Sequence, residues 1–218
     1  MDGILVVNKP AGITSHDVVD IIRRRFKVKK VGHAGTLDPM ATGVLVVLIG
    51  KATKLSNTFI NDNKEYVATL FIGRSTDTQD STGRIVDERP FNGQDTAIIK
   101  EILSGFIGAR EQVPPMISAK KYKGIKLYQL ARKGKIVDRK PCLIKIHEIE
   151  ALDFKPPEII FRVRCSKGTY VRTLCEDIGR AMGYPAHMSG LTRTASGRFT
   201  LGEAKGLETV SEKDIQPI

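Results

Sequence analysis

The amino-acid sequence predicts an α+β protein built around a largely antiparallel sheet. Segments typical of strands outnumber those typical of helices, and turns rich in glycine, proline and aspartate join most of them. The chain has 218 residues, of which 41% are hydrophobic, so it is long enough for one sizeable core. No internal repeat or low-complexity linker interrupts the sequence, and we expect a single domain over residues 1–218.

The first third of the chain is expected to alternate strands with short helices. Residues 4–7 are typical of a short strand, and residues 14–26 carry capping hydroxyls followed by apolar residues at helical spacing. The apolar run 43–49 predicts a second strand, and 51–59 predicts a short helix. Residues 64–72 alternate with period two, which predicts a strand with one apolar side.

The remainder of the chain continues this alternation. Asp95 precedes an apolar stripe that predicts a helix, and the prolines at 114 and 115 end that pattern. The other expected elements are strands at 142–152, 159–165 and 191–195, a short helix at 126–133, a helix reaching about residue 182, a loop at 183–189 and a short, frayed helix within 203–218.

Residues 32–43 hold one acid, one imidazole, three glycines and a proline. Proline disfavours a helical conformation for the residue before it, so Asp38 is expected in an extended conformation. Glycine permits a positive φ or a close approach to a ligand. The stretch therefore predicts a shaped loop, not a helix or a plain strand, that presents the Asp38 carboxylate. A plain Asp-Pro turn between two strands is the alternative, and shape alone favours it.

The charge of the chain indicates its partners. Lys and Arg number 35 and Asp and Glu 24, giving a net charge of +11, so nucleic acid is the first expected partner and an acidic membrane surface the second. Six basic residues at 23–30 either complement a helix dipole or contact phosphates. Residues 118–140 carry nine Lys or Arg with Tyr122 and Tyr128 interleaved, which favours a nucleic-acid groove over a solvated helical face.

Several classes of protein are not expected. No apolar run reaches the roughly 18 residues of a membrane span, and the first residues do not resemble a signal peptide. Three cysteines without C-x-x-C spacing suit a reducing cytoplasm and disfavour a zinc site. Asp77 and Asp80 lack the glycine and distal glutamate of a calcium loop, so we interpret them as turn formers, and no metal is expected.

The stretch from Val31 to Leu45 closely resembles the signature loop of the TruB family of tRNA pseudouridine synthases. Further motifs resemble that family in the same order and cover nearly the whole chain. They are Asn8-Lys9-Pro10, Lys64-Glu65-Tyr66, the turn from Gly73 to Asp80, the segments Ser118 to Gly124 and Leu127 to Gly134, the stretch Cys165 to Leu174, and Leu191-Thr192-Arg193.

The resemblance implies a pseudouridine synthase fold with a basic thumb insertion at about 118–140. It also implies the reaction, in which uridine 55 in the T-loop of tRNA is isomerised to pseudouridine without a metal or an organic cofactor. Asp38 matches the family's catalytic aspartate and is the expected nucleophile. Attack on the sugar, attack on the base and removal of a sugar proton all remain open for its role.

The resemblance also assigns roles around a uracil that is flipped out of its stack. Tyr66 is expected to stack on the base, Tyr170 and Leu191 to line the pocket, and His33 to fill the space that the base leaves. Arg172 matches the basic partner of the aspartate and would keep its carboxylate ionised. From the residues alone, Tyr66 and Leu191 would be core residues and Arg172 a phosphate contact.

The expected RNA contacts lie outside this pocket. Lys120 and Lys121 belong to the thumb, and Arg23 and Arg24 belong to the basic helix end. Lys9 is expected to support the loop or to bind a phosphate. The family's bacterial members commonly carry an additional C-terminal RNA-binding domain of the PUA type, which we do not expect here because the sequence ends soon after Leu207.

Three hypotheses follow from the sequence. The first is a monomeric, cytoplasmic isomerase that acts on the T-stem-loop of tRNA. The second is an RNA-binding or tRNA-folding protein that uses the same surface without catalysis. The third is a pseudouridine synthase that acts on another stem-loop RNA.

Overall fold

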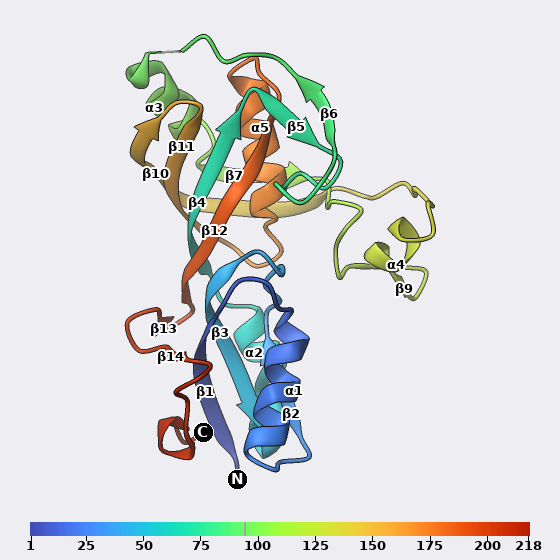
Figure 1. Cartoon of the computed structure of the whole chain (residues 1–218), viewed down its shortest axis with the longest axis vertical. Helices are drawn as coiled ribbons and strands as arrows, with labels where there is room; N and C mark the ends of the chain where they lie inside the picture. The colour runs from blue at the N-terminus through green and yellow to red at the C-terminus, as the bar shows by residue number, and fades with distance from the viewer. Residues whose placement is uncertain (94) are drawn as a thin grey trace. The chain divides into compact units, whose positions relative to one another are not determined.

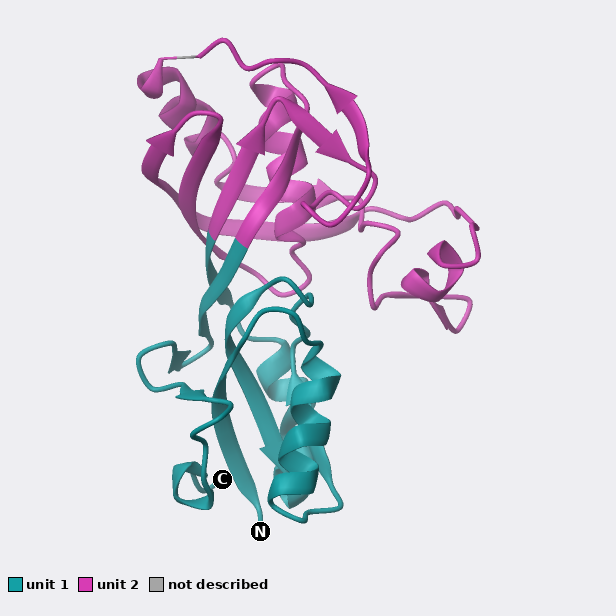
Figure 2. Cartoon of the chain, in the orientation of Figure 1, with its two compact units in different colours: residues 1–67, 191–218 teal, residues 68–190 magenta. Residues whose placement is uncertain are grey.

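The computed structural model describes residues 1–93 and 95–218. The chain forms two compact units (Figure 2): residues Met1–Val67 and Leu191–Ile218 make unit 1, and residues Ala68–Gly190 make unit 2. Two strands, β4 (Lys64–Ile72) and β12 (Ala186–Ser196), run from one unit into the other. The expected single catalytic domain over residues 1–218 stays a prediction, because a division into two compact units does not show how many domains fold independently.

Unit 1 is a small mixed sheet with helices (Figure 1). Besides the first residues of β4 and the last residues of β12, its elements are β1 (Gly3–Lys9), α1 (Ser15–Arg25), β2 (Val31–Ala34), β3 (Thr42–Ile49), the 3-10 helix η1 (Gly50–Leu55), α2 (Ser56–Ile60), β13 (Phe199–Thr200), β14 (Lys205–Gly206) and the 3-10 turn η2 (Glu212–Asp214).

Strand β3 lies in the middle of this sheet. It pairs antiparallel with β1 and β2 and parallel with β12, where Arg193 is opposite Gly43. Both faces of β3 are buried: Leu45 and Val47 pack in the cluster that includes α1, and Val44 and Val46 pack in the opposite cluster. Burial on both faces explains why this strand is a continuous apolar run in the sequence.

Helix α1 begins where its sequence predicts. Thr14 is the N-cap, and its side chain and that of Asp17 form a capping box. Val18 and Ile22 face the core, and the helix ends at Arg25, the last of three arginines in its final turn, with Phe26 as the C-cap. Arg25 donates a hydrogen bond to the carbonyl of Leu207, so this arginine also holds the C-terminal segment.

Unit 2 contains the remaining strands of the large sheet, the helices α3 and α5, and the thumb at 118–140. Its elements, besides the remainder of β4 and β12, are β5 (Arg74–Thr76), β6 (Ile85–Glu88), α3 (Thr96–Ser104), β7 (Gly108–Gln112), β8 (Lys121–Tyr122), β9 (Ile125–Lys126), α4 (Leu127–Ala131), β10 (Cys142–Lys155), β11 (Glu158–Cys165) and α5 (Val171–Ala181).

The strands of unit 2 follow the order β12-β4-β11-β10-β7. Strand β10 pairs antiparallel with both β11 and β7, and helix α3 packs against β10 and α5. Along β4 the buried positions alternate strictly, which confirms the predicted apolar side. The predicted α+β class with a largely antiparallel mixed sheet is therefore confirmed.

The structure corrects four local predictions. Residues 32–34 of the glycine-rich stretch belong to strand β2, so the loop is shorter than expected. Residues 186–189, expected as loop, begin strand β12. Strand β7 was missed; it lies at the end of the strand order, paired with β10, and its Glu111 is exposed. The expected C-terminal helix is only the three-residue turn η2.

Among the described residues, none of the helices has both the length and the apolar composition needed to cross a membrane.

Candidate active site

The loop that carries Asp38 connects β2 to β3 in unit 1. Gly35 at its start and Gly43 just after its end have φ values of 96° and 100°, which only glycine adopts without strain. The carbonyl of Asp38 accepts a hydrogen bond from the amide of Ala41 at 3.0 Å, which closes a turn directly after the aspartate. Asp38 itself is half-buried, and the predicted presentation of its carboxylate to a substrate stays a prediction.

Lys9 lies beneath this loop. Its side chain is buried, and its Nζ donates to the carbonyls of Pro10 at 2.8 Å, Ile13 at 2.8 Å and Pro39 at 3.2 Å. The pKa of Lys9 is lowered to about 8, chiefly by burial; the charge of Asp38 opposes this shift, and the charge of Arg193 adds to it. Since all three donors are engaged by carbonyls, this geometry favours loop support over a direct contact with phosphate.

Arg193 supports the loop from β12. Its guanidinium is buried, with the residue 1% exposed, and its Nε donates to the carbonyl of Val44 at 2.7 Å. Its Nη2 donates to the carbonyl of Gly35 at 3.0 Å. The sequence identified Arg193 only as the last residue of a family motif, and no local pattern indicated that it would connect the two ends of the loop.

Unit 1 also holds three of the residues that were expected to surround the flipped base. His33 lies on β2 and is half-buried, Tyr66 lies on the apolar side of β4 and is 9% exposed, and Leu191 lies on β12 and is half-buried. The burial of Tyr66 agrees with the core role that its periodicity alone suggested. Its expected stacking on a uracil stays a prediction, as do the roles of His33 and Leu191.

Arg172 lies in the first turn of α5, in unit 2. Its Nη1 donates to the carbonyl of Thr78 at 3.0 Å and its Nη2 to the carbonyl of Ile117 at 2.8 Å. Its Nη1 also lies 3.6 Å from a carboxylate oxygen of Asp80, and both side chains of this ion pair are buried. Sequence reasoning missed Asp80 as an ionic partner. The expected pairing of Arg172 with Asp38 stays a prediction.

Asp80 is in addition the turn former that the sequence suggested. Its Oδ1 accepts hydrogen bonds from the Thr78 hydroxyl at 2.7 Å and from the Thr82 amide at 3.0 Å. The carboxylate therefore orders the turn between β5 and β6 while it faces Arg172. Over residues 1–93 and 95–218, no group of three His, Cys, Asp or Glu side chains is placed to hold a metal ion.

Tyr170 is the N-cap residue of α5 and is half-buried. The side chain of Gln112, on β7, donates to its carbonyl at 3.1 Å and accepts from its amide at 2.8 Å. Strand β7, which the sequence did not reveal, therefore fixes the backbone at the start of α5. The pocket-lining role of Tyr170 stays a prediction.

The thumb at 118–140 is basic and partly folded around α4. Lys126 and Arg132 lie over the ring of Tyr128 at 5.7 and 5.5 Å, so that ring already contacts cations of its own chain. Lys121 is exposed, whereas Lys120 is half-buried and donates to the thiol of Cys142. Lys121 therefore has the accessibility that an RNA contact requires.

The basic end of α1 lies at the C-terminus of the helix, with three arginines in the last turn. Arg23 pairs with Asp20, and the Nε of Arg24 donates to the carbonyl of Asp20 at 3.3 Å. Arg24 is nevertheless exposed, as are Lys27, Lys29 and Lys30. Contacts of Arg23 and Arg24 with RNA stay predictions.

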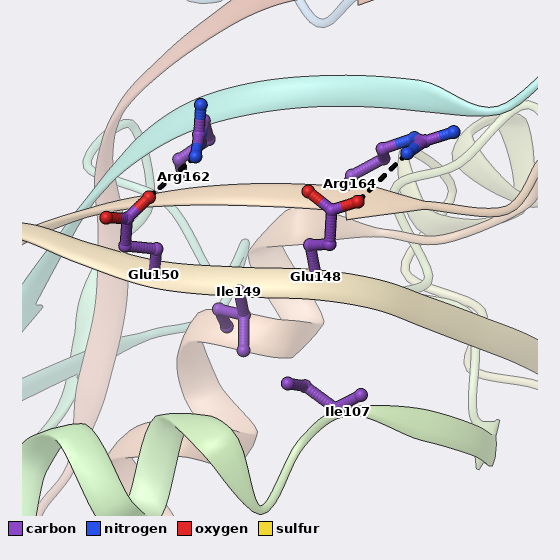
Figure 3. Close-up of a pocket in the computed structure, with 6 residues that line it drawn as sticks. All are labelled: Ile107, Glu148, Ile149, Glu150, Arg162 and Arg164. Carbon is purple, nitrogen blue, oxygen red and sulfur yellow. Dashed lines mark hydrogen bonds and ion pairs between the residues drawn. The ribbon is translucent and has the colours of Figure 1, made fainter.

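A pocket of about 250 Å³ lies elsewhere in unit 2 (Figure 3). Its charged side chains pair across β10 and β11, Arg162 with Glu150 at 2.6 Å and Arg164 with Glu148 at 2.9 Å. Ile107 and Ile149 complete its lining. None of the predicted site residues lines this pocket, and its charges are satisfied within the protein, so we do not place the active site there.

Solved structures share this fold. The chain from a crystal structure titled as a Cbf5-Nop10-Gar1 complex superposes with a TM-score of 0.77 and 31% identity, over 99% of this chain and 60% of that one. A structure titled as an H/ACA RNP bound to a substrate RNA containing 2′-deoxyuridine gives 0.72 and 28%, over 99% and 59%. The present chain thus spans about 60% of these two neighbours.

The fold and the family models that match the chain define the class as pseudouridine synthases, which are isomerases. A family model described as the N-terminal domain of TruB family pseudouridylate synthase matches residues 23–171, and a model of the tRNA pseudouridylate synthase B C-terminal domain matches 172–215. The chain belongs to the TruB family.

Curated relatives agree with this assignment. A protein of Syntrophotalea carbinolica named tRNA pseudouridine synthase B is 50% identical over 210 residues, which cover 96% of this chain and 69% of the relative. One of the same name from Opitutus terrae is 45% identical over 218 residues, which cover 100% of this chain and 90% of the relative.

Proposed function

We propose that the protein isomerises uridine 55 in the T-loop of tRNA to pseudouridine. The observation that carries the proposal is the loop of Asp38, bound by the buried cations of Lys9 and Arg193, in a chain of the TruB family. The names of the curated relatives support tRNA as the substrate class. Because tRNA is the substrate, we place the activity in the cytoplasm, and we expect the enzyme to act as a monomer.

The proposed reaction is an internal rearrangement. The N1–C1′ bond breaks, the base rotates and a C5–C1′ bond forms; C5 loses its proton and N1 gains one, so no atom enters or leaves overall. Asp38 acts as the nucleophile, and the released base stays in the pocket until it is rejoined. Such a step needs no cofactor or metal.

The base must leave its stack before the chemistry begins. In the proposed complex Tyr66 stacks on the flipped uracil, Tyr170 and Leu191 line its pocket, and His33 fills the space left in the RNA. Arg172 favours the ionised form of Asp38, since a guanidinium nearby stabilises a carboxylate in a dry site.

The deciding experiment is incubation of the purified protein with unmodified tRNA, followed by mapping of pseudouridine. We expect product at the T-loop uridine, and we expect Asp38→Asn to bring product below detection, because an amide is not a nucleophile of comparable strength. Asp153→Asn is the matched control, since Asp153 pairs with Lys155 on β10. Circular dichroism of each variant shows whether it is folded.

The outcomes separate the alternatives. Absence of product with the wild-type protein at the T-loop uridine would refute the proposal. Product in another stem-loop RNA alone would support the third hypothesis, which the likeness to a structure titled with a bound substrate RNA favours. Full activity of Asp38→Asn would remove Asp38 from the mechanism, and RNA binding or refolding without product would identify a non-catalytic protein.

A further inference from the structure

A buried hydroxyl lies against the residue that precedes Asp38. Ser15, the first residue of α1, is 1% exposed. Its Oγ accepts a hydrogen bond from the amide of Leu37 at 2.8 Å, and the same hydroxyl donates to the carbonyl of Leu37 at 3.1 Å. One side chain therefore satisfies both polar groups of that residue's backbone.

The backbone of Leu37 needs these hydrogen bonds because it is buried. Leu37 is 3% exposed and lies outside any strand or helix, so neither a regular ladder nor bulk water serves its amide and carbonyl. Buried backbone groups without a partner are costly, which makes a substitute partner necessary. Ser15 supplies it from a helix that is already fixed against the core through Val18 and Ile22.

The residue that follows Asp38 is held as well. The carbonyl of Pro39 accepts hydrogen bonds from the Nζ of Lys9 at 3.2 Å and from the amide of Gly12 at 2.9 Å. The backbone on both sides of Asp38 is thus bound to β1, to α1 and to the turn between them. With Leu37 and Pro39 both held, little freedom is left to the Cα of Asp38.

The hydroxyl of Ser15 is not occupied in starting the helix. Thr14 caps the helix instead. Its Oγ1 accepts a hydrogen bond from the amide of Asp17 at 3.0 Å, and the Asp17 carboxylate accepts one from the amide of Thr14 at 2.8 Å. Two adjacent hydroxyl residues therefore have separate tasks: Thr14 caps α1, and Ser15 binds the loop.

We propose that Ser15 is a positioning residue for the Asp38 carboxylate. This inference rests on the proposed function, because it assigns Ser15 a role in the step that Asp38 performs. Without the hydroxyl the loop loses two hydrogen bonds beside the aspartate, and a displacement of about 1 Å at a reacting group lowers a rate by up to about 100-fold.

The test measures single-turnover isomerisation and tRNA affinity separately. For Ser15→Ala we expect the single-turnover rate to fall by roughly 10- to 100-fold, while the Kd for tRNA stays within about twofold of wild type. Ser15→Cys keeps the shape of the side chain, but its larger sulfur is only a weak donor and acceptor, so we expect the rate to fall for this variant too.

Two controls separate positioning from general destabilisation. Thr14→Ala removes the helix cap and should lower the melting temperature with the rate unchanged. Ser196→Ala changes a serine that is also 1% exposed in unit 1, whose Oγ has no hydrogen-bond partner within the described part of the chain. We expect this variant to match wild type in rate.

The possible results distinguish failure of the inference about Ser15 from failure of the proposed function. A wild-type rate for both Ser15→Ala and Ser15→Cys overturns the inference and leaves the proposed function standing. Loss of rate in Thr14→Ala equal to that in Ser15→Ala also overturns it, because the effect would then follow helix stability. Absence of product with the wild-type protein refutes the proposed function itself.

Discussion

Lys9 shows how a single buried cation can organise a loop and also titrate. Its ammonium is removed from water and bonded to three carbonyls, one of them in the residue after Asp38. Burial brings its pKa to about 8, from the ordinary 10.5. In the folded protein Lys9 is therefore close to half-protonated near pH 8, whereas in the unfolded chain it stays charged to much higher pH.

This difference sets a pH dependence of stability. Between pH 8 and about 10.5 the unfolded chain binds more protons at Lys9 than the folded protein, so a rise in pH stabilises the folded state relative to the unfolded one. We expect Lys9→Met to lack this contribution. Urea unfolding of both proteins at pH 7.5, 9 and 10 measures it.

The expected result is that wild type gains stability relative to Lys9→Met as the pH rises. Lys155→Met is the control, since Lys155 is exposed and its pKa is raised by its bond with Asp153. A difference between wild type and Lys9→Met that is constant across this pH range would contradict the assignment.

Individual residues were predictable from the sequence where their role follows from local chemistry. Proline at 39 and the surrounding glycines predicted a loop around Asp38, and the structure confirms a loop between β2 and β3. The contacts of Ser15 and Arg193 with the loop and the ion pair of Asp80 with Arg172 could not be found in this way, because each partner is distant in sequence or is a backbone atom. Backbone carbonyls have no signature in a sequence.

At the level of elements, the close pairing of β3 with β12 depends on Gly43. Its φ is 100°, and a Cβ built there would lie 2.2 Å from the carbonyl oxygen of Arg193. The two backbones meet at the point where the loop of Asp38 joins β3. A side chain at this position would have to displace β12 or the loop.

We therefore expect Gly43→Ala to lower the free energy of unfolding by at least about 2 kcal/mol, from both the clash and the unfavourable φ. Gly12→Ala is a matched control: its φ is 87°, yet a Cβ there meets no atom within 4 Å. This control should cost only about 1 kcal/mol. Chemical denaturation compares the two variants, and equal losses would show that contact with β12 is unimportant.

Strands whose buried and exposed residues alternate regularly were predicted best from the sequence. Strand β4 alternates throughout, and its bounds agree with the prediction. Strand β7 and the first residues of β12 were not recognised: the first is a polar edge strand, and the second follows a Gly-Tyr-Pro turn that suggested a longer loop. The pairing of strands depends on contacts between residues that are distant in sequence, and local sequence patterns do not reveal those contacts.

At the level of the whole molecule, the net charge of +11 is the property that matters for a polyanionic substrate. Binding of tRNA should weaken steeply as salt rises, because each phosphate contact releases counterions. Lys121 is an exposed candidate for such a contact in the thumb. We expect Lys121→Gln to weaken binding and to reduce the slope of log K against log salt by about 1.

Filter binding at several salt concentrations measures these slopes. Lys155→Gln removes the same charge from β10, where Asp153 already neutralises it, and should leave the slope unchanged. A salt response that is flat for the wild-type protein would contradict the electrostatic account of binding. Equal slopes for wild type and Lys121→Gln would remove this lysine from the RNA contacts.

The way in which the loop of Asp38 is held has a consequence for its redesign. Ser15, Lys9 and Arg193 bind main-chain atoms of Leu37, Pro39 and Gly35. These hydrogen bonds do not depend on which side chain is present at an exposed loop position such as Thr36. Variation at Thr36 can therefore alter the surface offered to RNA while the scaffold that places the carboxylate stays the same.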